Sequence, residues 1–190
     1  MNENQKIKEG AALILEGLAD AYGLNAHDSH FKDTPARVAR AYSEICRGLN
    51  KTENQVTKIL STAFEDDFNQ MIIIKKIRTY SLCPHHLLPV EYDIDAAYIP
   101  DGSILGLSKI ARICEILSAR PIVQELLTNE IADTLMTIKP KGAAVYMKGK
   151  HFCMRMRGVK ATSSVTETSA IREAFYEPEI RAEFFSMIKQ

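Results

Sequence analysis

The chain has 190 residues, of which 46% are hydrophobic and 25% charged, the composition of a soluble globular protein. Its 24 Lys and Arg residues are balanced by 24 Asp and Glu residues, so it lacks the basic excess typical of nucleic-acid or membrane-surface binders. No apolar run approaches the ~20 residues of a membrane span and no secretion signal is recognisable, so we expect a cytoplasmic protein.

The N-terminal part of the chain has the pattern of helices. Apolar residues at helical spacing predict a helix over residues 5–23. A capping aspartate followed by a proline predicts a second helix over residues 33–47, and a shorter one is expected at 53–60. We therefore expect an N-terminal helical region, residues 1–60, and a second domain, residues 61–190.

The second domain alternates between groups of strands and groups of helices. Its β-branched runs and apolar periodicities predict strands and helices in separate runs, which favours an α+β fold with an antiparallel sheet. The predicted strands are 71–81, 92–99, 143–148, 152–159 and 162–169, and the predicted helices are 107–119, 121–138 and 177–188.

Two short segments carry residues that bind metals. Cys83 and His86 are three positions apart, a spacing that lets both bind one ion from a tight turn. A third soft ligand, Cys153, lies far along the chain, and the two segments meet if their strands are neighbours in a sheet. Three protein ligands leave a fourth position for water, the arrangement of a catalytic zinc. A structural zinc would need a fourth protein ligand, for which the sequence offers no good candidate.

The other candidate residues have ordinary interpretations as well. A lone cysteine is usually a small buried apolar residue, and we expect Cys46 and Cys114 to pack on apolar helix faces. His27 and His30 lie in a polar segment, where we expect them to be solvated. Taken alone, Glu125 is best interpreted as a solvated acid on a helix.

Several motifs, in this order along the chain, resemble the GTP cyclohydrolase I family. The resemblance covers about residues 30–188 and implies a tunnelling fold, an antiparallel sheet backed by helices whose barrel is completed by oligomerisation. It also implies a homodecamer of two pentamers with active sites between subunits. The motifs are Asp33–Arg40, Cys83–Pro89, Ala97–Pro100, Gly106–Ile113, Val123–Glu125, Leu127–Thr128 and His151–Val159.

The implied reaction is hydrolysis of GTP to formate and 7,8-dihydroneopterin triphosphate, the first step of tetrahydrofolate and pterin biosynthesis. By this resemblance Cys83, His86 and Cys153 would bind zinc, and the zinc-bound water would attack C8 of guanine. His85 and His151 would be the catalytic residues that transfer protons, and neither counts as a ligand.

The same resemblance assigns residues to the substrate. Glu125 would accept hydrogen bonds from N1–H and the amine of guanine, which excludes adenine, and Gln124 would assist. The chain has no Gly-rich phosphate loop, so side chains must hold the triphosphate. The matching positions are Arg37, Arg40, Ser108, Lys109, Arg112 and Arg157.

Some positions depart from the family pattern. Loss of residues that support metal ligands typically costs about 10–100-fold in affinity or activity. Two alternatives therefore stay open: a diverged paralogue that hydrolyses another purine or pterin, and a non-catalytic regulatory homologue that binds nucleotide. Retention of both catalytic histidines argues against the second. The departures are Pro84 for Glu, Lys76 for Asp, Tyr92 for Gly, Asp95 for His, Leu126 for Arg and Glu173 for Gly.

Overall fold

The computed structural model of the protein describes residues 3–49 and 52–189. The chain forms two compact units, Met1–Arg47 and Gly48–Gln190, each with its own internal contacts. None of the helices in the described ranges is long and apolar enough to span a bilayer.

The first unit consists of two helices that pack against each other, α1 (Glu3–Tyr22) and α2 (Thr34–Ile45). A single 3-10 turn, η1 (Ser29–Phe31), lies in the loop that joins them. The predicted end of α1 is confirmed: Gly23 follows it with φ +73°, and its N–H donates to the carbonyl of Ala19 at 2.9 Å.

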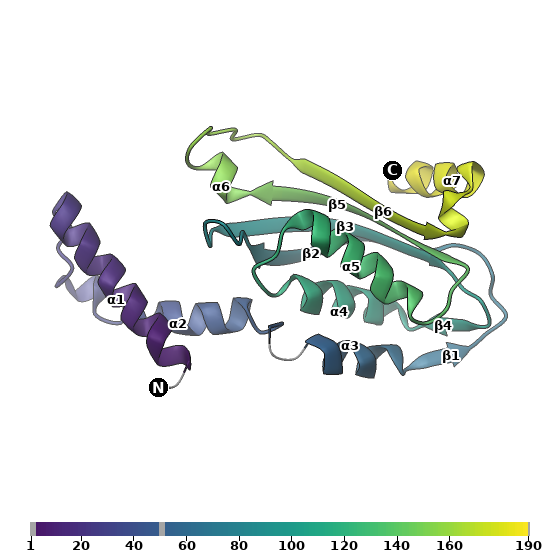
Figure 1. Cartoon of the computed structure of the whole chain (residues 1–190), viewed down its shortest axis with the longest axis horizontal. Helices are drawn as coiled ribbons and strands as arrows, with labels where there is room; N and C mark the ends of the chain where they lie inside the picture. The colour runs from purple at the N-terminus through teal and green to yellow at the C-terminus, as the bar shows by residue number, and fades with distance from the viewer. Residues whose placement is uncertain (1–2, 50–51, 190) are drawn as a thin grey trace. The chain divides into compact units, whose positions relative to one another are not determined.

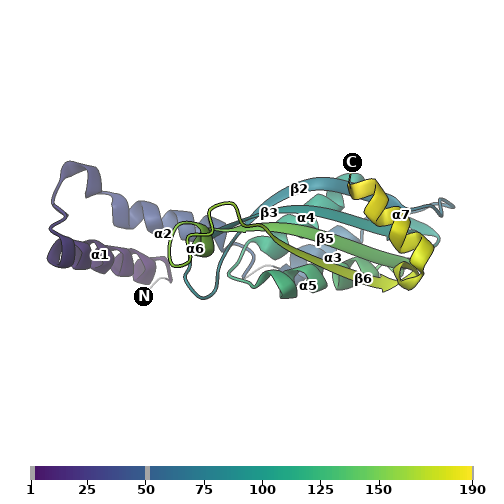
Figure 2. The ribbon, with the colours of Figure 1, turned by 90° about the horizontal axis from the view of Figure 1, so that it is seen from above.

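The second unit is built on a four-stranded antiparallel sheet (Figure 1). The strands lie side by side in the order β2-β3-β5-β6, as Figure 2 shows, so each pairs with a neighbour of opposite direction. A small two-stranded sheet pairs β1 with β4. The bounds are β1 (Ala63–Glu65), β2 (Ile72–Leu82), β3 (Pro89–Ile99), β4 (Ser103–Leu105), β5 (Gly142–His151) and β6 (Thr166–Glu173).

Helices cover both faces of the four-stranded sheet. On one face α4 packs on β2 and α5 packs on β5 and β6, with α3 outside α4. The C-terminal helix α7 lies on the opposite face (Figure 1). The bounds are α3 (Thr52–Leu60), α4 (Leu107–Ser118), α5 (Gln124–Met136), α6 (Phe152–Arg155), η2 (Ala174–Tyr176) and α7 (Pro178–Ile188).

The two cores follow from the period of two along β3. Because successive side chains of a strand point to opposite faces, every second residue of β3 enters the core under α4 and α5. The residues between them enter a smaller core on the other face, where Ala97 and Ile99 pack with Phe184 of α7. The first set is Val90, Tyr92, Ile94, Ala96 and Tyr98, all at 0% exposure.

The α+β fold class predicted from the sequence is confirmed, but three boundaries are corrected. The strand predicted at 143–148 extends as β5 to His151, and the strand predicted at 152–159 does not form, because the chain turns into α6 there. The strand predicted at 162–169 lies at Thr166–Glu173. The helix predicted from Pro121 begins at Gln124, because the chain before it bonds to the end of β2.

Candidate metal centre and active site

A tight turn after β2 places two predicted ligands side by side. The backbone N–H of Cys83 donates to the carbonyl of Leu88, and the N–H of Leu87 donates to the carbonyl of Cys83, both at 2.8 Å. Leu87 has φ +53°, so the chain reverses sharply within this turn. As a result Sγ of Cys83 lies 3.6 Å from Nδ1 of His86.

The third ligand reaches this turn from the end of β5. The strand of Cys83 is not a neighbour of β5, because β3 lies between them. Val90, at the start of β3, pairs with His151, so β5 ends beside the turn, and α6 then carries Cys153. The ligand atoms of Cys83, His86 and Cys153 all lie within 4.8 Å of one another.

These three side chains could hold one metal ion. Two sulfurs and one imidazole nitrogen are a donor set that suits zinc. Within the described residues, this is the one group of three or more His, Cys, Asp or Glu side chains that converge in this way. The cluster thus offers three protein ligands to one ion.

The two thiols are in an environment that favours a cation. Burial raises the pKa of the Cys153 thiol above its ordinary value, and the neighbouring Cys83 raises it further, while Arg157 acts in the opposite direction. Two thiolates this close repel each other unless a positive charge lies between them, and a bound metal supplies that charge and deprotonates its thiol ligands.

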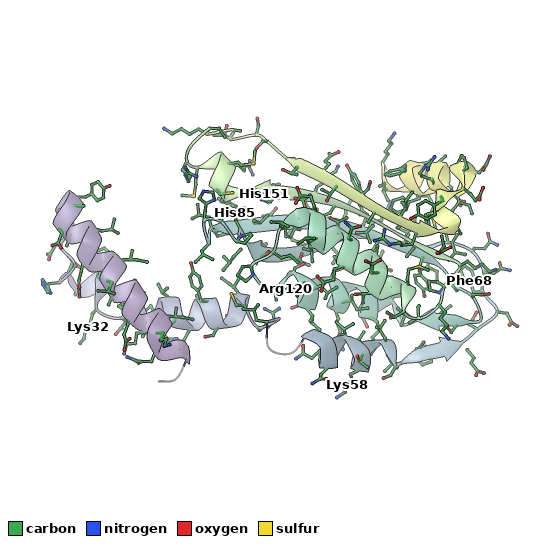
Figure 3. The ribbon with its side chains drawn as sticks, in the orientation of Figure 1. Lys32, Lys58, Phe68, His85, Arg120 and His151 are labelled. Carbon is green, nitrogen blue, oxygen red and sulfur yellow. The ribbon has the colours of Figure 1, made fainter. Side chains whose placement is uncertain are left out.

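The two predicted catalytic histidines lie near this cluster, one in the turn that carries Cys83 and the other at the end of β5. His85 is exposed, with Nδ1 3.7 Å from Sγ of Cys83. His151 is partly buried, and its Nε2 lies 2.8 Å from Oε1 of Gln124. Burial lowers the pKa of His151, and the charge of Glu125 opposes that effect. Figure 3 shows both histidines at the end of the sheet that carries α6.

The two residues predicted to contact guanine have different surroundings. Both begin α5, but Gln124 is only 1% exposed and its amide bonds to other protein groups. Glu125 is exposed in the first turn, close enough to His151 to influence its pKa. Glu125 is therefore accessible to a substrate, whereas the amide of Gln124 points into the protein.

The predicted phosphate-binding residues are not all brought together in one chain. Arg157 follows α6 and contacts His86. Ser108, Lys109 and Arg112 lie at the start of α4. The end of α4 lies beside β2, where Ser118 bonds to Thr79, and the ten helical steps from Ser108 to Ser118 span about 15 Å. The start of α4 is therefore the end of the helix that lies far from the cluster.

Arg37 and Arg40 belong to the first unit. Both are exposed on α2, about one helical turn apart, and Arg37 pairs with Asp33 at 3.4 Å. Among the residues expected to have ordinary roles, Cys114 is fully buried and both His27 and His30 are exposed. Cys46 is only partly buried.

Two departures from the family pattern are partners of each other. The backbone N–H of Lys76 donates to Oδ1 of Asp95 at 2.8 Å, at a bulge between Ile74 and Ile77 where Lys76 has φ +58°. The Asp95 carboxylate thus satisfies an N–H that the bulge removes from the ladder. Pro84 and Leu126 are both exposed.

Two residues near His151 were not predicted to belong to the site. The buried ring of Tyr92 meets that of His151 edge to face, with centroids 6.1 Å apart. Opposite Tyr92 on β5 lies Gly149, where an added Cβ would lie 2.0 Å from Oε1 of Gln124. A glycine inside a strand is the sequence signal that could have revealed this close approach.

Comparison with known proteins gives a consistent result. The family model of GTP cyclohydrolase I matches residues 11–189. A GTP cyclohydrolase 1 from Caldanaerobacter subterraneus subsp. tengcongensis is 45% identical over 99% of this chain and 98% of its own length. One from Pelotomaculum thermopropionicum is 45% identical over 100% and 98%, and one from Clostridium perfringens is 40% identical over 99% of both.

Among solved structures, the archaeosine synthase QueF-Like in its apo form is 19% identical to this chain. It covers 53% of this chain and 91% of its own, with a TM-score of 0.44.

Proposed function

The chain belongs to the GTP cyclohydrolase I family, and on that basis we propose that it hydrolyses GTP to formate and 7,8-dihydroneopterin triphosphate. The observation that supports this most directly is the convergence of Cys83, His86 and Cys153 beside Glu125 and His151. We propose that the enzyme works in the cytoplasm, at the first step of tetrahydrofolate and pterin biosynthesis.

The metal that fits the cluster is zinc, because two thiolates and an imidazole are ligands it prefers. When bound, zinc supplies the Lewis acidity that makes water a nucleophile at neutral pH. His85 and His151 lie near the cluster and exchange protons with the substrate. A proton delivered to a ring nitrogen of guanine makes C8 a better electrophile, and further proton transfers accompany ring opening.

Glu125 gives the site its preference for guanine. Its exposed carboxylate accepts two hydrogen bonds, from N1–H and from the exocyclic amine, while adenine presents no such pair of donors. A polar group that is matched by one base and left unpaired by another discriminates by orders of magnitude.

The triphosphate is held by side chains from more than one chain. Arg157 contributes from the chain that carries the cluster. Because the start of α4 lies far from this cluster, Ser108, Lys109 and Arg112 serve the site of a neighbouring subunit. This supports active sites between subunits and a homodecamer made of two pentamers. Residues 61–190 form the catalytic domain, and Arg37 and Arg40 remain candidate phosphate ligands by family resemblance alone.

The test is to incubate the zinc-loaded protein with GTP and to assay formate together with the fluorescent pterin that appears after oxidation. Cys153→Ser should abolish zinc binding and product, and His85→Ala should abolish product while zinc is retained. Cys46→Ser, at a partly buried cysteine outside the cluster, should keep both. Turnover of another purine alone would indicate a diverged paralogue, and GTP binding without turnover a regulatory homologue.

A further inference from the structure

The imidazole of His151 is held by a buried amide. Its Nε2 lies 2.8 Å from Oε1 of Gln124, whose side chain is 1% exposed. An amide oxygen only accepts hydrogen bonds, so Nε2 of His151 carries a proton. In the neutral ring the lone pair then belongs to Nδ1.

The orientation of that amide is set by its other contacts. Nε2 of Gln124 lies 3.3 Å from the carbonyl of Met147, 3.0 Å from that of Thr166, and 3.0 Å from Oγ1 of Thr168. Two of these three groups only accept, so the amide nitrogen must face them. A flipped amide would place its oxygen against two carbonyl oxygens and turn its nitrogen toward His151.

A closed ring of hydrogen bonds supports the same residue. Oγ1 of Thr128 donates to the backbone carbonyl of Gln124 at 2.8 Å, so its one proton is used. Oγ1 of Thr168, 2.7 Å away, therefore donates to Thr128 and accepts from the Gln124 amide. The ring begins and ends at Gln124, and each bond polarises the next.

The space for the amide exists because residue 149 is a glycine. An added Cβ there would lie 2.0 Å from Oε1 of Gln124 and 3.0 Å from Nε2 of His151. Tyr92, paired with Gly149 across the strands, closes the site with its ring against the imidazole. The chain thus leaves a gap at one position of β5 that the Gln124 amide fills.

We infer that Gln124 is a positioning residue that holds His151 in the tautomer protonated on Nε2, with Gly149 providing the space for its amide. This rests on the proposed role of His151 in proton transfer. Nδ1 is then the nitrogen that exchanges protons with the substrate. The role differs from the direct contact with guanine that the family resemblance implies for Gln124, because the amide already has partners on both sides.

Two variants disturb the amide in independent ways. Gln124→Met keeps the length of the side chain and removes the acceptor. Gly149→Ala keeps Gln124 but pushes its amide aside, and the added Cβ meets only side-chain atoms, of Gln124 and His151, so the strand can be retained. Gly10→Ala is the matched control, because an added Cβ there meets nothing within 4 Å.

The readout is the tautomer of His151 in the zinc-loaded full chain, from solid-state NMR with ¹⁵N in the histidine rings. The chain has five histidines, and the His151 signals are those that disappear in His151→Ala. We expect the wild type and Gly10→Ala to show a proton on Nε2 alone. Both site variants should show a mixture of tautomers.

Kinetics with GTP then separate positioning from binding. We expect kcat to fall about 10–100-fold in both site variants, while KM stays within about threefold. A proton on Nδ1 in the wild type would overturn the inference. So would an unchanged tautomer in Gln124→Met with the loss confined to KM, which would make Gln124 a substrate ligand. If the wild type does not turn over GTP, the proposed function fails, but the tautomer still decides the role of Gln124.

Discussion

The guanidinium of Arg157 donates a hydrogen bond to the imidazole of His86, with Nη1 and Nε2 2.9 Å apart. Arginine only donates, so Nε2 of His86 uses its lone pair in this contact. When neutral His86 binds a metal through Nδ1, Nε2 must carry the proton, and when it binds through Nε2 the lone pair is taken. In either case a bound metal would be incompatible with this contact, and Arg157 would be free to bind another acceptor.

Removal of the metal should therefore weaken GTP binding in part through Arg157. In the His151→Ala background, which prevents turnover, we expect the loss of zinc to raise the Kd for GTP. Arg157 should contribute about 1.5 kcal/mol, or about tenfold, to that rise. In Arg157→Ala, made in the same background, loss of zinc should raise the Kd for GTP by a factor that is smaller by about tenfold. Titration calorimetry of both proteins with and without zinc measures the two rises. An equal rise in the two proteins would show that His86 does not restrain Arg157.

Cys114 should make the protein less stable at high pH. Burial raises the pKa of its thiol from 9.0 to about 12. Below pH 9 the thiol is neutral in both states, whereas between pH 9 and 12 it ionises only after unfolding. Each pH unit in that window should remove about 1.4 kcal/mol of stability. Urea unfolding at pH 9 and 10 should show a smaller decrease for Cys114→Ala than for the wild type, and equal decreases would contradict the assignment.

Two glycines of β5 should respond differently to alanine. At Gly142 an added Cβ would lie 2.7 Å from the carbonyl oxygen of Arg172 and 2.8 Å from the nitrogen of Ala174, which are backbone atoms that cannot move alone. Gly142→Ala should lower the free energy of unfolding by about 1–3 kcal/mol. Gly149→Ala meets the ends of side chains and no backbone, so it should cost less than Gly142→Ala even with the Gln124 amide displaced. Chemical denaturation of both variants measures the difference, and the reverse order would contradict it.

Glu173 lies in a backbone conformation that suits glycine, with φ +51° and ψ −117°. Such a conformation costs a non-glycine residue about 1–3 kcal/mol, and glycine avoids this cost. Glycine also loses more chain entropy on folding, which offsets about 0.5–1 kcal/mol of the benefit. We expect Glu173→Gly to raise the free energy of unfolding by about 1 kcal/mol. Glu167 lies on the same strand and is not among the residues with positive φ, so Glu167→Gly should lower the free energy of unfolding. If both variants lose stability, Glu173 is not strained.

Much of the fold follows from local patterns that the sequence alone contains. The apolar period of α1, the proline at the start of α2 and the β-branched start of β2 each determine structure within a few residues. The Gly that the family has at position 173 is a local signal of the positive φ found at Glu173. The chemistry of the metal cluster is likewise visible as residue types, because thiol and imidazole ligands are rare in close spacing.

The tertiary structure decided what depends on distant partners. Residues 152–159 were predicted as a strand from composition, but a strand needs an edge to pair with, and the chain turns into α6 instead. The approach of Cys153 to Cys83 depends on β3 lying between β2, which Cys83 follows, and β5, which leads into α6. The burial of Gln124 and the tautomer of His151 depend on acceptors 23 to 44 residues away in the chain. Sequence determines which groups are available, and only packing determines which of them meet, because hydrogen bonds and metal ligation act over a few ångströms in space regardless of separation along the chain.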